Sequence, residues 1–486
     1  MSNKKNLSKY ILALLGIVAL GAFLRFYRFL PNFMYTGEMG TDYMNIWNII
    51  HGVRTFLIGP RTSHEWLFIS PIGYWIYTVL LLIWNYNLIV ISVFWGIVGS
   101  FSVLINYAVV KKIFNKNIAL ISSFLIATSP AWINQTRNSR YNLAAAILFL
   151  PFLLFLRDSI KDKGKSLFKL GLILGLTMSF FPSPILLIPA SIAGFIFYSV
   201  KPKFKYILNF ILGFLIPNTA FIIYEVSNKF SITLQLLSWV PYRILGFFGL
   251  YPKNTVNTTT LSQNIYSIYH FFAESFLGYA NILTLVLFIL TIGFSVFFIK
   301  RFYKNKNKEM PFFLLIISLV VSYVGLFIHG NPPEHYYLVI FPVPAILAAY
   351  ILDKLIKKKT VLIVSTLILG TIGLYGLYKV NWFYQDKLPV NYLIRPVPYE
   401  LQLKMVNSII KDARGAEFSL FRKGPNDHFE NDFANNYIYL LTVRGAKIKE
   451  GARIQYTIIE GEENLTGSEG KLIFSEAATY IYKTQL

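Results

Sequence analysis

Long apolar stretches separated by short polar ones run through most of this chain. Each stretch has about 20 residues, which as a helix matches the thickness of the hydrocarbon core of a bilayer. A helix also satisfies its own backbone hydrogen bonds in lipid. The pattern therefore predicts an all-α polytopic membrane protein with about 11–13 transmembrane helices. The predicted spans lie near residues 10–29, 67–84, 88–110, 118–136, 141–157, 168–181, 183–199, 206–224, 280–300, 311–328, 336–353 and 360–378.

The C-terminal residues 379–486 lack such stretches. PYELQLKMVNSIIKDA has the spacing of an amphipathic helix, and EFSLF, RIQYTIIEG and KLIFSEAATYIYK have the composition of strands. We therefore expect a small α/β domain there, after a transmembrane domain formed by residues 1–378. Two large loops, 30–66 and 225–279, are expected on the outer side of the membrane. The mixture of aromatic and polar residues in 225–279 favours helices that lie in the interface.

Composition agrees with this assignment, because 55% of the residues are hydrophobic and only 14% are charged. The mean hydropathy is +0.52. A net charge of +23 would suggest nucleic acid as the partner of a soluble protein. Here the excess lies in short loops between apolar stretches, where it instead indicates cytoplasmic loops, so no nucleic-acid partner is expected. These basic loops are 111–116, 157–169, 201–205, 300–308 and 354–359.

The charge distribution predicts a multi-pass protein of the plasma membrane with a cytoplasmic N-terminus and an extracytoplasmic C-terminal domain. The first apolar run ends in LRFYRFLP rather than in a small-residue cleavage site, so we expect an uncleaved first span. One inconsistency remains near the start. Spans 67–84, 88–110 and 118–136 would give an odd number of crossings between two loops that should both lie outside. One of them must be re-entrant, interfacial or merged with its neighbour.

Two carboxylates follow the first span, in GEMGTDYMNIWNIIHG. If this stretch is helical, Glu38 and Asp42 project from one face, one turn apart. Such a pair suits a general base, a divalent-metal site or a group that binds hydroxyls. The spacing alone favours a simpler interpretation, in which acids near the start of a short helix cap it or face water.

The basic residues differ between the two sides of the membrane. Those predicted inside are nearly all Lys, whereas those predicted outside are mostly Arg, which binds phosphate in a bidentate manner. In NQTRNSRYN, Arg137 and Arg140 are expected at a helix start, where the helix terminus also favours phosphate. A single Arg is more simply explained by snorkelling to headgroups. As a set beside paired acids, however, they indicate an outward-facing site for a lipid-linked phosphate. The outer arginines are Arg25, Arg28, Arg54, Arg61, Arg137, Arg140 and Arg243.

A third candidate region is HGNPPEHYYLVIFPVP, which is expected at an outer helix start. His335 suits a sugar hydroxyl or a phosphate, with Tyr336 beside it, although an interfacial aromatic belt explains much of this composition. His51 and His64 lie in the first outer loop, but no spacing is typical of zinc. The chain has no cysteine, which excludes disulfides and thiolate sites. No Gly-rich phosphate loop supports nucleotide use.

Together these motifs resemble membrane glycosyltransferases with the GT-C fold. The similarity is to glycosyltransferase family 39 and its bacterial relatives, which include protein O-mannosyltransferases and lipid A aminoarabinose transferases. Glu38 falls at the position of the acid that the family has in its first loop, and Pro60 and Pro71 match two proline positions. ATSPAWINQTRNSRYNLAAA and EHYYLVIFPVPAILAA resemble later family segments. The resemblance covers about residues 10–355, and the order of its motifs makes it more specific than any one of them.

One departure from the family pattern concerns metal binding. Several members have an Asp shortly after Arg-Tyr, whereas this chain has Asn142, Leu143 and three alanines. A carboxylate of the second loop is therefore missing. This puts metal binding in doubt, so no cofactor is certain. The resemblance leaves a divalent cation such as Mg²⁺ or Mn²⁺ as one possibility, held if at all by Glu38 and Asp42.

The resemblance implies transfer of a sugar from a polyprenyl-phosphate carrier to an acceptor hydroxyl at the outer face, normally with inversion. It implies Glu38 as the catalytic base, with Asp42 orienting the acceptor or sharing the role. Cationic and polar groups would bind the phosphate of the donor, and two first-loop residues would lie beside the acceptor. The expected donor-side residues are Arg137, Arg140, Arg243, His335 and Tyr336, and the expected acceptor-side or loop residues are Arg61 and His64. The expected partners are the lipid-linked donor, membrane lipids and a glycan, lipid or protein acceptor.

Three alternatives stay open at this stage. A flippase or carrier for lipid-linked sugars would be expected to show repeated halves and polar sites at mid-membrane. An O-antigen ligase or polymerase also uses outer arginines, but lacks the early acidic loop. An inactive relative with a partner-binding outer domain is the third, because the second acid is missing. The clustering of acids and arginines at outer helix ends favours the glycosyltransferase.

Overall fold

The computed structural model describes residues 2–62, 64, 66–138, 141–248, 250, 261–277, 282–304, 309–329, 334–387, 396–424, 434–461 and 470–485. It contains two compact units. The bundle unit comprises residues 1–26, 56–76 and 93–380, and the sheet unit comprises residues 27–55, 77–92 and 381–486.

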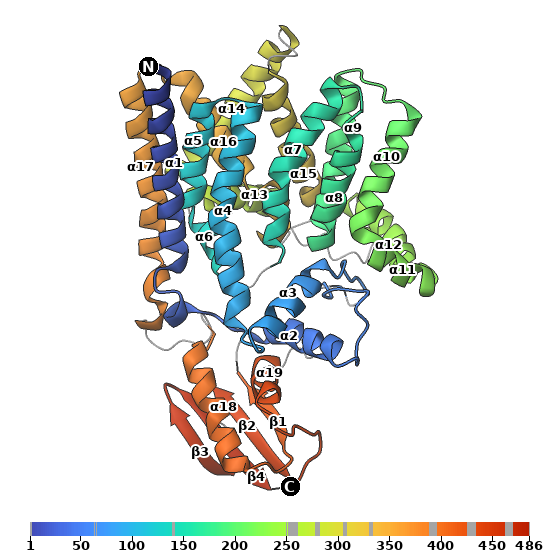
Figure 1. Ribbon diagram of the computed structural model, residues 1–486, viewed down its shortest axis with the longest axis vertical. Helices are drawn as coiled ribbons and strands as arrows, with labels where there is room; N and C mark the ends of the chain where they lie inside the picture. Colours follow the sequence, from blue (N-terminus) through green and yellow to red (C-terminus); the bar gives the residue numbers. More distant parts are fainter. Residues whose placement is uncertain are drawn as a thin grey trace. The chain divides into compact units, whose positions relative to one another are not determined.

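The bundle unit is made of helices (Figure 1), and each predicted apolar stretch contains one. Six helical segments among the described residues are long and apolar enough to cross a membrane, and shorter apolar helices lie between them. These findings confirm a polytopic membrane protein. The helices, of which α3 and α4 contribute residues to both units, are α1 (Ser2–Phe26), α3 (Ile72–Ile83), α4 (Ile89–Ile113), α5 (Lys116–Thr128), α6 (Pro130–Arg137), α7 (Leu143–Lys161), α8 (Leu167–Phe180), η2 (Ser183–Leu186), α9 (Leu187–Phe197), α10 (Phe204–Leu215), η3 (Ile216–Asn218), α11 (Thr219–Ser227), α12 (Ser231–Phe247), α13 (Leu261–Leu277), α14 (Ile282–Lys304), α15 (Met310–His329), η5 (Glu334–Ile340), α16 (Val343–Leu355) and α17 (Lys359–Lys379).

Helix lengths explain the odd number of predicted crossings. With 12 residues, α3 is about 18 Å long, which is too short for a core of about 30 Å. The stretch at 118–136 forms α5 and α6, which are separated at Ser129. The Ser129 hydroxyl accepts a hydrogen bond from the Trp132 N–H at 3.3 Å and so caps α6. If α4 crosses once and α5 with α6 crosses once, the loops before and after them lie on the same side.

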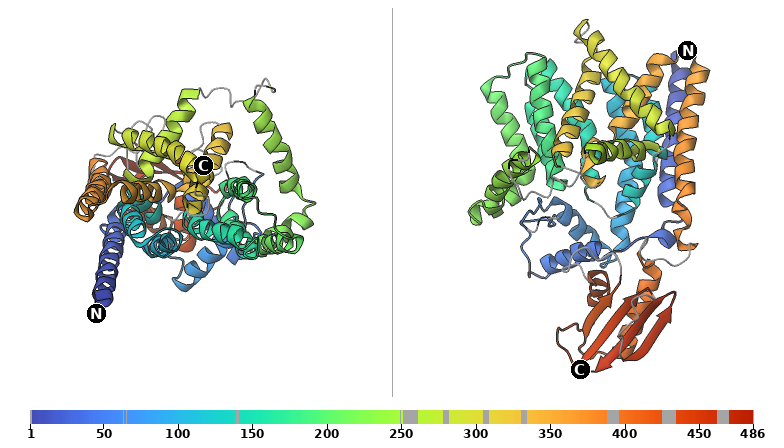
Figure 2. Two further views of the ribbon diagram at one scale, coloured as in Figure 1. Left: turned by 90° about the horizontal axis from the view of Figure 1, so that it is seen from above. Right: turned by 180° about the vertical axis from the view of Figure 1, so that it is seen from behind.

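The lysine-rich connections lie at one end of the bundle unit. Figure 1 shows the α4–α5, α7–α8, α9–α10 and α16–α17 connections at the end that also holds the N-terminus. The stretch 225–279 was expected to form interfacial helices, and it contains α12 and α13. Figure 2 (right) shows α13 running across the long helices rather than along them. Residues 251–260 of this stretch lie outside the described residues.

The sheet unit contains a four-stranded sheet with the order β1-β2-β4-β3. The β1–β2 pair is parallel and the other two pairs are antiparallel. Figure 1 shows α18 against this sheet. Every fourth residue of α18 (Leu401, Met405 and Ile409) is buried, as its amphipathic spacing predicts. The elements are η1 (Leu30–Asn32), α2 (Gly37–Ile50), η6 (Trp382–Lys387), α18 (Tyr399–Ala413), β1 (Ser419–Lys423), α19 (Asn435–Val443), β2 (Ile454–Glu460), β3 (Lys471–Glu476) and β4 (Thr479–Gln485).

Two features of the sheet unit differ from the sequence prediction. KLIFSEAATYIYK was expected to be a single strand, but it forms the hairpin β3–β4. Its turn residues Ala477 and Ala478 both have positive φ angles, 47° and 53°. Alanine rarely adopts this conformation, so the usual Gly or Asn signal of a hairpin is missing. Helix α19 was not predicted, because its nine residues are too few to show a clear period.

Asp412 links α18 to the sheet, and its removal should weaken the sheet unit. Its Oδ2 accepts hydrogen bonds from the Lys483 ammonium at 2.7 Å and the Tyr456 hydroxyl at 2.6 Å. These two donors lower the pKa of Asp412. We expect Asp412→Asn to lower the free energy of unfolding by about 1 kcal/mol at pH 7. Because the folded pKa is depressed, the difference should shrink as pH falls below the ordinary Asp pKa of about 4.

Thermal unfolding of the solubilised protein at pH 7 and below pH 4 measures this effect. Glu417→Gln is the control, since Glu417 pairs with Lys449 and both side chains are more than half exposed. It should leave the unfolding temperature unchanged. A destabilisation by Asp412→Asn that did not depend on pH would contradict the ionic origin of the effect.

Candidate functional site

Helix α2 carries the two predicted acids at its start. The Thr36 hydroxyl caps the helix by accepting a hydrogen bond from the Met39 N–H at 3.4 Å. Glu38 lies in the first turn and is exposed, and Asp42 follows one turn later and is half-buried. The helical spacing assumed from the sequence is therefore confirmed. A negative charge at this position is favoured by the helix dipole.

Another face of α2 is packed. Its buried residues are Gly40, Tyr43 and Ile46. At 100° per residue, the face of Glu38 and Asp42 lies about 120° around the helix from the centre of the buried face. The two carboxylates thus share a face that differs from the packed one, with Glu38 exposed and Asp42 half-buried on it.

This helix alone does not make a complete metal cage. Among the residues described, no group of three or more His, Asp or Glu side chains gathers in a way that could hold a metal ion. Two carboxylates are nevertheless enough for Mg²⁺ when substrate phosphate and water supply the other ligands. Glu38 and Asp42 therefore fit a cation shared with a phosphate-bearing substrate better than a permanently bound one.

The predicted acceptor-side residues lie on a small hairpin of the bundle unit, of which residues 59–62, 64 and 66–70 are described. Its two sides are joined by hydrogen bonds from the Gly59 N–H to the Ile69 carbonyl at 2.8 Å and from the Thr62 N–H to the Leu67 carbonyl at 2.9 Å. Arg61 pairs with Phe68 across it in an isolated antiparallel bridge. His64 lies in its turn, where the His64 N–H donates to the Thr62 hydroxyl at 3.2 Å. The hairpin thus holds Arg61 and His64 near each other.

His64 is also part of a group that we name the tryptophan cluster, consisting of His64, Trp66, Trp239 and Arg243. The His64 ring centroid lies 5.8 Å from that of Trp66 and 5.1 Å from that of Trp239. The guanidinium carbon of Arg243 lies 5.1 Å from the Trp239 ring centroid. The structure therefore brings His64, predicted for the acceptor side, together with Arg243, predicted for the donor side.

Arg243 enters this cluster from α12 with part of its hydrogen-bonding capacity unused. Its Nε is buried and has no hydrogen-bond partner among the described residues. A buried guanidinium donor without an acceptor is costly, so a ligand with anionic or hydroxyl oxygens would be favoured there. The flat Trp66 and Trp239 rings offer apolar faces beside it.

The positive charge of Arg243 affects the protonation of His64. Burial lowers the pKa of His64, and the positive charge of Arg243 lowers it further. Arg243→Gln removes that charge, so we expect the pKa of His64 to rise toward its ordinary value. Arg243→Lys keeps the charge and should leave the pKa low. Histidine NMR of the labelled protein, assigned with His64→Gln, measures this.

An unchanged pKa of His64 in Arg243→Gln would show that the two side chains do not interact in the membrane-embedded protein. The downward shift of the His64 pKa also predicts how the stability of the protein depends on pH. With a depressed folded pKa, neutral His64 contributes stability that is lost as pH falls below the ordinary His pKa. This loss should be smaller in Arg243→Gln.

Arg137 is placed differently from the prediction, which put it at a helix start. It is the last residue of α6, and the next helix, α7, begins only at Leu143. The argument from a helix N-terminus is therefore wrong for Arg137, and Arg140 lies outside the described residues. Arg137 is only 3% exposed, and its Nη1 donates to the Leu24 carbonyl at 3.5 Å. It is thus a buried cation at the end of α1.

Arg25 is a second buried cation in this region. It is fully buried, and its Nη1 donates to the Gly21 carbonyl at 2.8 Å. Its Nε and Nη2 have no hydrogen-bond partner among the described residues. Arg25 and Arg137 both contact carbonyls of the last turns of α1, where the helix dipole favours positive charge.

The predicted residues His335 and Tyr336 lie together on η5. Their ring centroids are 4.9 Å apart, and each lies 5.6 Å from the ring of Phe181, which follows α8. Both side chains are half-buried. The three rings therefore form an aromatic cluster. Glu334 begins the same element, and its side chain lies outside the described part of the chain.

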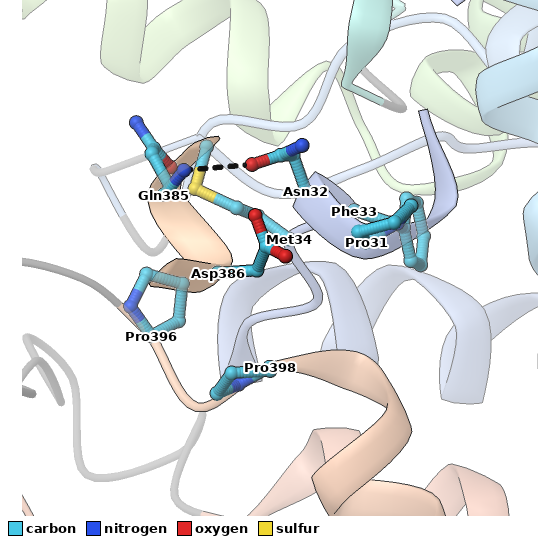
Figure 3. Close-up of a pocket in the computed structure, with 8 residues that line it drawn as sticks. All are labelled: Pro31, Asn32, Phe33, Met34, Gln385, Asp386, Pro396 and Pro398. Atoms are coloured by element: carbon cyan, nitrogen blue, oxygen red, sulfur yellow. Dashed lines mark hydrogen bonds between the residues drawn. The ribbon is translucent and has the colours of Figure 1, made fainter. Parts of the chain in front are cut away.

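Figure 3 shows a pocket within the sheet unit that none of the predicted site residues lines. It is a small, partly open hollow between η1, η6 and the chain ahead of α18, and its volume of about 270 Å³ includes space open to solvent. The Gln385 N–H donates to the Asn32 Oδ1 at 2.9 Å across it (Figure 3). Asp386 is paired with Arg28 at 2.6 Å. Because these polar groups bond each other, we interpret the pocket as the junction between η1 and η6.

Sequence reasoning missed Trp66, Trp239 and the buried role of Arg25. Trp66 stands two residues after His64, in the stretch that was already singled out. Trp239 and Arg243 are four residues apart, a spacing that places two side chains on one face of a helix. That spacing was available in the sequence. The contact with His64 was not, because it joins segments that are far apart in the chain.

Residues 69–224 match the family described as dolichyl-phosphate-mannose-protein mannosyltransferase. A comparison with curated proteins finds no match. The structure is similar to that of ArnT from Cupriavidus metallidurans bound to undecaprenyl phosphate, with a TM-score of 0.62 and 10% identity over 98% of both chains.

The fold is also similar to that of the Archaeoglobus fulgidus oligosaccharyltransferase. Its complex with Zn and sulfate gives a TM-score of 0.54 at 12% identity and covers 90% of this chain and 62% of that one. AglB from the same organism, in complex with an inhibitory peptide and a dolichol-phosphate, gives 0.50 at 14% identity and covers 83% and 58%. This chain thus spans less than two thirds of the length of these archaeal enzymes.

Proposed function

We propose that this protein transfers a sugar from a polyprenyl-phosphate carrier to an acceptor hydroxyl. The chain has the GT-C fold and resembles the family 39 glycosyltransferases. The predicted resemblance is confirmed by the family match and by the fold. The observation that carries the proposal is the likeness to ArnT over 98% of both chains. Two carboxylates at the exposed start of α2 add the chemistry that such a transfer needs.

The reaction joins one oxygen to the anomeric carbon and releases another. The acceptor hydroxyl attacks the anomeric carbon, and its proton passes to a carboxylate. The bond between the anomeric carbon and the phosphate oxygen breaks, and its electron pair leaves with the polyprenyl phosphate. We assign proton removal to Glu38, which is exposed in the first turn of α2, with Asp42 one turn away to orient the acceptor or share the role.

The departing phosphate needs positive charge and hydrogen-bond donors. Arg243 has a buried Nε without a described partner, and Arg137 is a buried cation. We assign both residues to binding of the donor phosphate. His335 and Tyr336 would make further contacts with the donor, and so would Arg140, which the sequence predicted for this role. His64 and Arg61, on the hairpin next to Arg243, would contact the sugar or the acceptor. A Mg²⁺ or Mn²⁺ ion, if used, would be held by Glu38 and Asp42 together with the substrate.

The orientation of the protein follows from its charges. The connections rich in Lys share one end of the bundle unit with the N-terminus, and such loops remain in the cytoplasm. We therefore assign the N-terminus to the cytoplasm, and residues 27–55 and 381–486 to the outer side of the plasma membrane. The natural acceptor is a hydroxyl of a glycan, lipid or protein located there.

The test uses the purified full-length protein with polyprenyl-phosphate sugars, polyprenyl-diphosphate sugars and nucleotide sugars as donors. We expect transfer from the monophosphate-linked donors only. Parallel reactions with EDTA determine whether the two carboxylates work with a cation. Transfer from nucleotide sugars, or from none of the donors, would contradict the proposal.

A further inference from the structure

We propose that α19 is the support that holds α2 in its working position, so that Thr41, Gly40 and Asn435 act as positioning residues for the transfer. This inference rests on the proposed function, because it assigns a task relative to Glu38 and Asp42. It gives residues 381–486 a part in catalysis. All the contacts that carry it lie within the sheet unit.

The first observation is the close approach of the two helices. Figure 1 shows α19 beside α2. A Cβ atom added to Gly40 would overlap the backbone of Asn435 and Asn436. The start of α19 therefore contacts the backbone of α2 at Gly40, which lies between Glu38 and Asp42 in the sequence. Only glycine allows this distance, and any side chain at residue 40 would push the helices apart.

Polar and aromatic contacts fix the same interface. The Asn435 Nδ2 donates to the Thr41 hydroxyl at 2.8 Å, next to Asp42 in the chain. The Tyr43 and Tyr439 ring centroids are 5.2 Å apart. The Tyr439 hydroxyl also donates to the Tyr86 carbonyl at 3.0 Å. The register of α2 on α19 is thus specified by hydrogen bonds as well as by apolar packing.

Helix α19 is itself tied to the sheet through its buried side. The Tyr437 hydroxyl donates to the Glu460 Oε1 at 2.6 Å, and Glu460 forms a buried ion pair with Arg422 of β1. Glu460 is 3% exposed and Arg422 6%. Breaking a buried pair of this kind is unfavourable, so the sheet gives α19 a fixed place.

The segment just before α2 is hydrogen-bonded to α18, which also contacts the start of α19. The Gln402 Nε2 on α18 donates to the Tyr35 carbonyl at 2.8 Å, and its Oε1 accepts from the Asn436 Nδ2 at 2.9 Å. Gln402 is 1% exposed. The chain just before Glu38 and the start of α19 therefore share one buried amide. A displacement of about 1 Å at a reacting group can lower the rate about 10²-fold, so this support bears on catalysis.

Gly40→Ala separates the helices while leaving both acids in the chain. Alanine favours helix over glycine, so a loss cannot come from helix propensity. We expect kcat for sugar transfer to fall about tenfold or more, while donor binding and the donor KM stay unchanged. Gly16→Ala in α1 is the matched control, because a Cβ there meets nothing within 4 Å. It should retain wild-type kcat.

A double-mutant cycle keeps the proposal testable if Gly40→Ala does not fold. Thr41→Val and Asn435→Ala each remove one partner of the same hydrogen bond. We expect each to lower kcat and the double variant to lower it no further than the worse single one. Unchanged kcat in folded Gly40→Ala, or wild-type kcat in both single variants, would overturn the proposal. Absence of transfer by the wild-type protein would instead contradict the proposed function.

Discussion

Glu38→Gln is expected to lower kcat for sugar transfer by about 10²–10⁴-fold, the contribution of a positioned general base. The amide has nearly the same shape as the carboxylate but cannot accept the acceptor's proton. Glu38 is exposed on the first turn of α2, so the change should leave the fold intact. Transfer from a labelled polyprenyl-phosphate sugar, measured together with the unfolding temperature, gives both quantities.

Asp42→Asn distinguishes two roles for Asp42, orientation of the acceptor and shared removal of its proton. If Asp42 orients the acceptor, its loss should raise the acceptor KM more than it lowers kcat. If it shares proton removal, only the double variant should lose activity completely. Glu400→Gln is the matched control, because Glu400 is likewise an acid in the first turn of a helix of the sheet unit, α18. Full transfer by both Glu38→Gln and Asp42→Asn would show that the base lies elsewhere.

Arg137→Met is expected to lower kcat by about 10²–10³-fold through loss of charge beside the departing phosphate. Arg137→Lys keeps the charge but not the planar fork, so an intermediate loss is expected. The donor KM should change less than kcat, because the charge on the phosphate oxygen develops as the bond breaks.

The burial of Arg137 calls for a control that separates catalysis from stability. Arg157 donates from its Nη1 to the Lys112 carbonyl at 2.6 Å and lies on the side that we assign to the cytoplasm. Arg157→Met should affect stability to a similar degree without the loss in kcat. Equal losses of kcat in the two variants would mean that Arg137 acts only through the fold.

Much of the fold could be predicted from local patterns. Stretches of about 20 apolar residues predict membrane helices because backbone groups in lipid must bond within their own helix. The spacing of Glu38 and Asp42 correctly placed them on one helix face. The α18 helix was predicted from its amphipathic period. These features depend on neighbours within a few residues.

The errors arise where local signals are weak or where contacts are non-local. Helix α3 is as apolar as a span but too short to be one, and a hydropathy pattern does not mark its ends sharply. The β3–β4 hairpin turns at two alanines instead of a glycine. Arg137 ends a helix rather than beginning one. The packing of α2 on α19 joins residues about 400 positions apart, which no local period can indicate.

The candidate site was predicted in part. The structure groups His64 with Arg243 and His335 with Tyr336, as residues that the sequence had singled out. Their roles stay predictions. The tryptophans between His64 and Arg243 were missed because a Trp in an outer loop is usually explained by the membrane interface.

The proposed reaction breaks the bond between a sugar and polyprenyl phosphate. A single-turnover reaction in proteoliposomes with doubly labelled polyprenyl-phosphate sugar follows both halves of that bond. We predict that glycosylated acceptor and free polyprenyl phosphate appear in equal amounts and at the same rate, and that Glu38→Gln slows the formation of both by about 10²–10⁴-fold. Movement of the intact lipid-linked sugar across the bilayer, with neither product formed, would contradict the claim and identify a carrier.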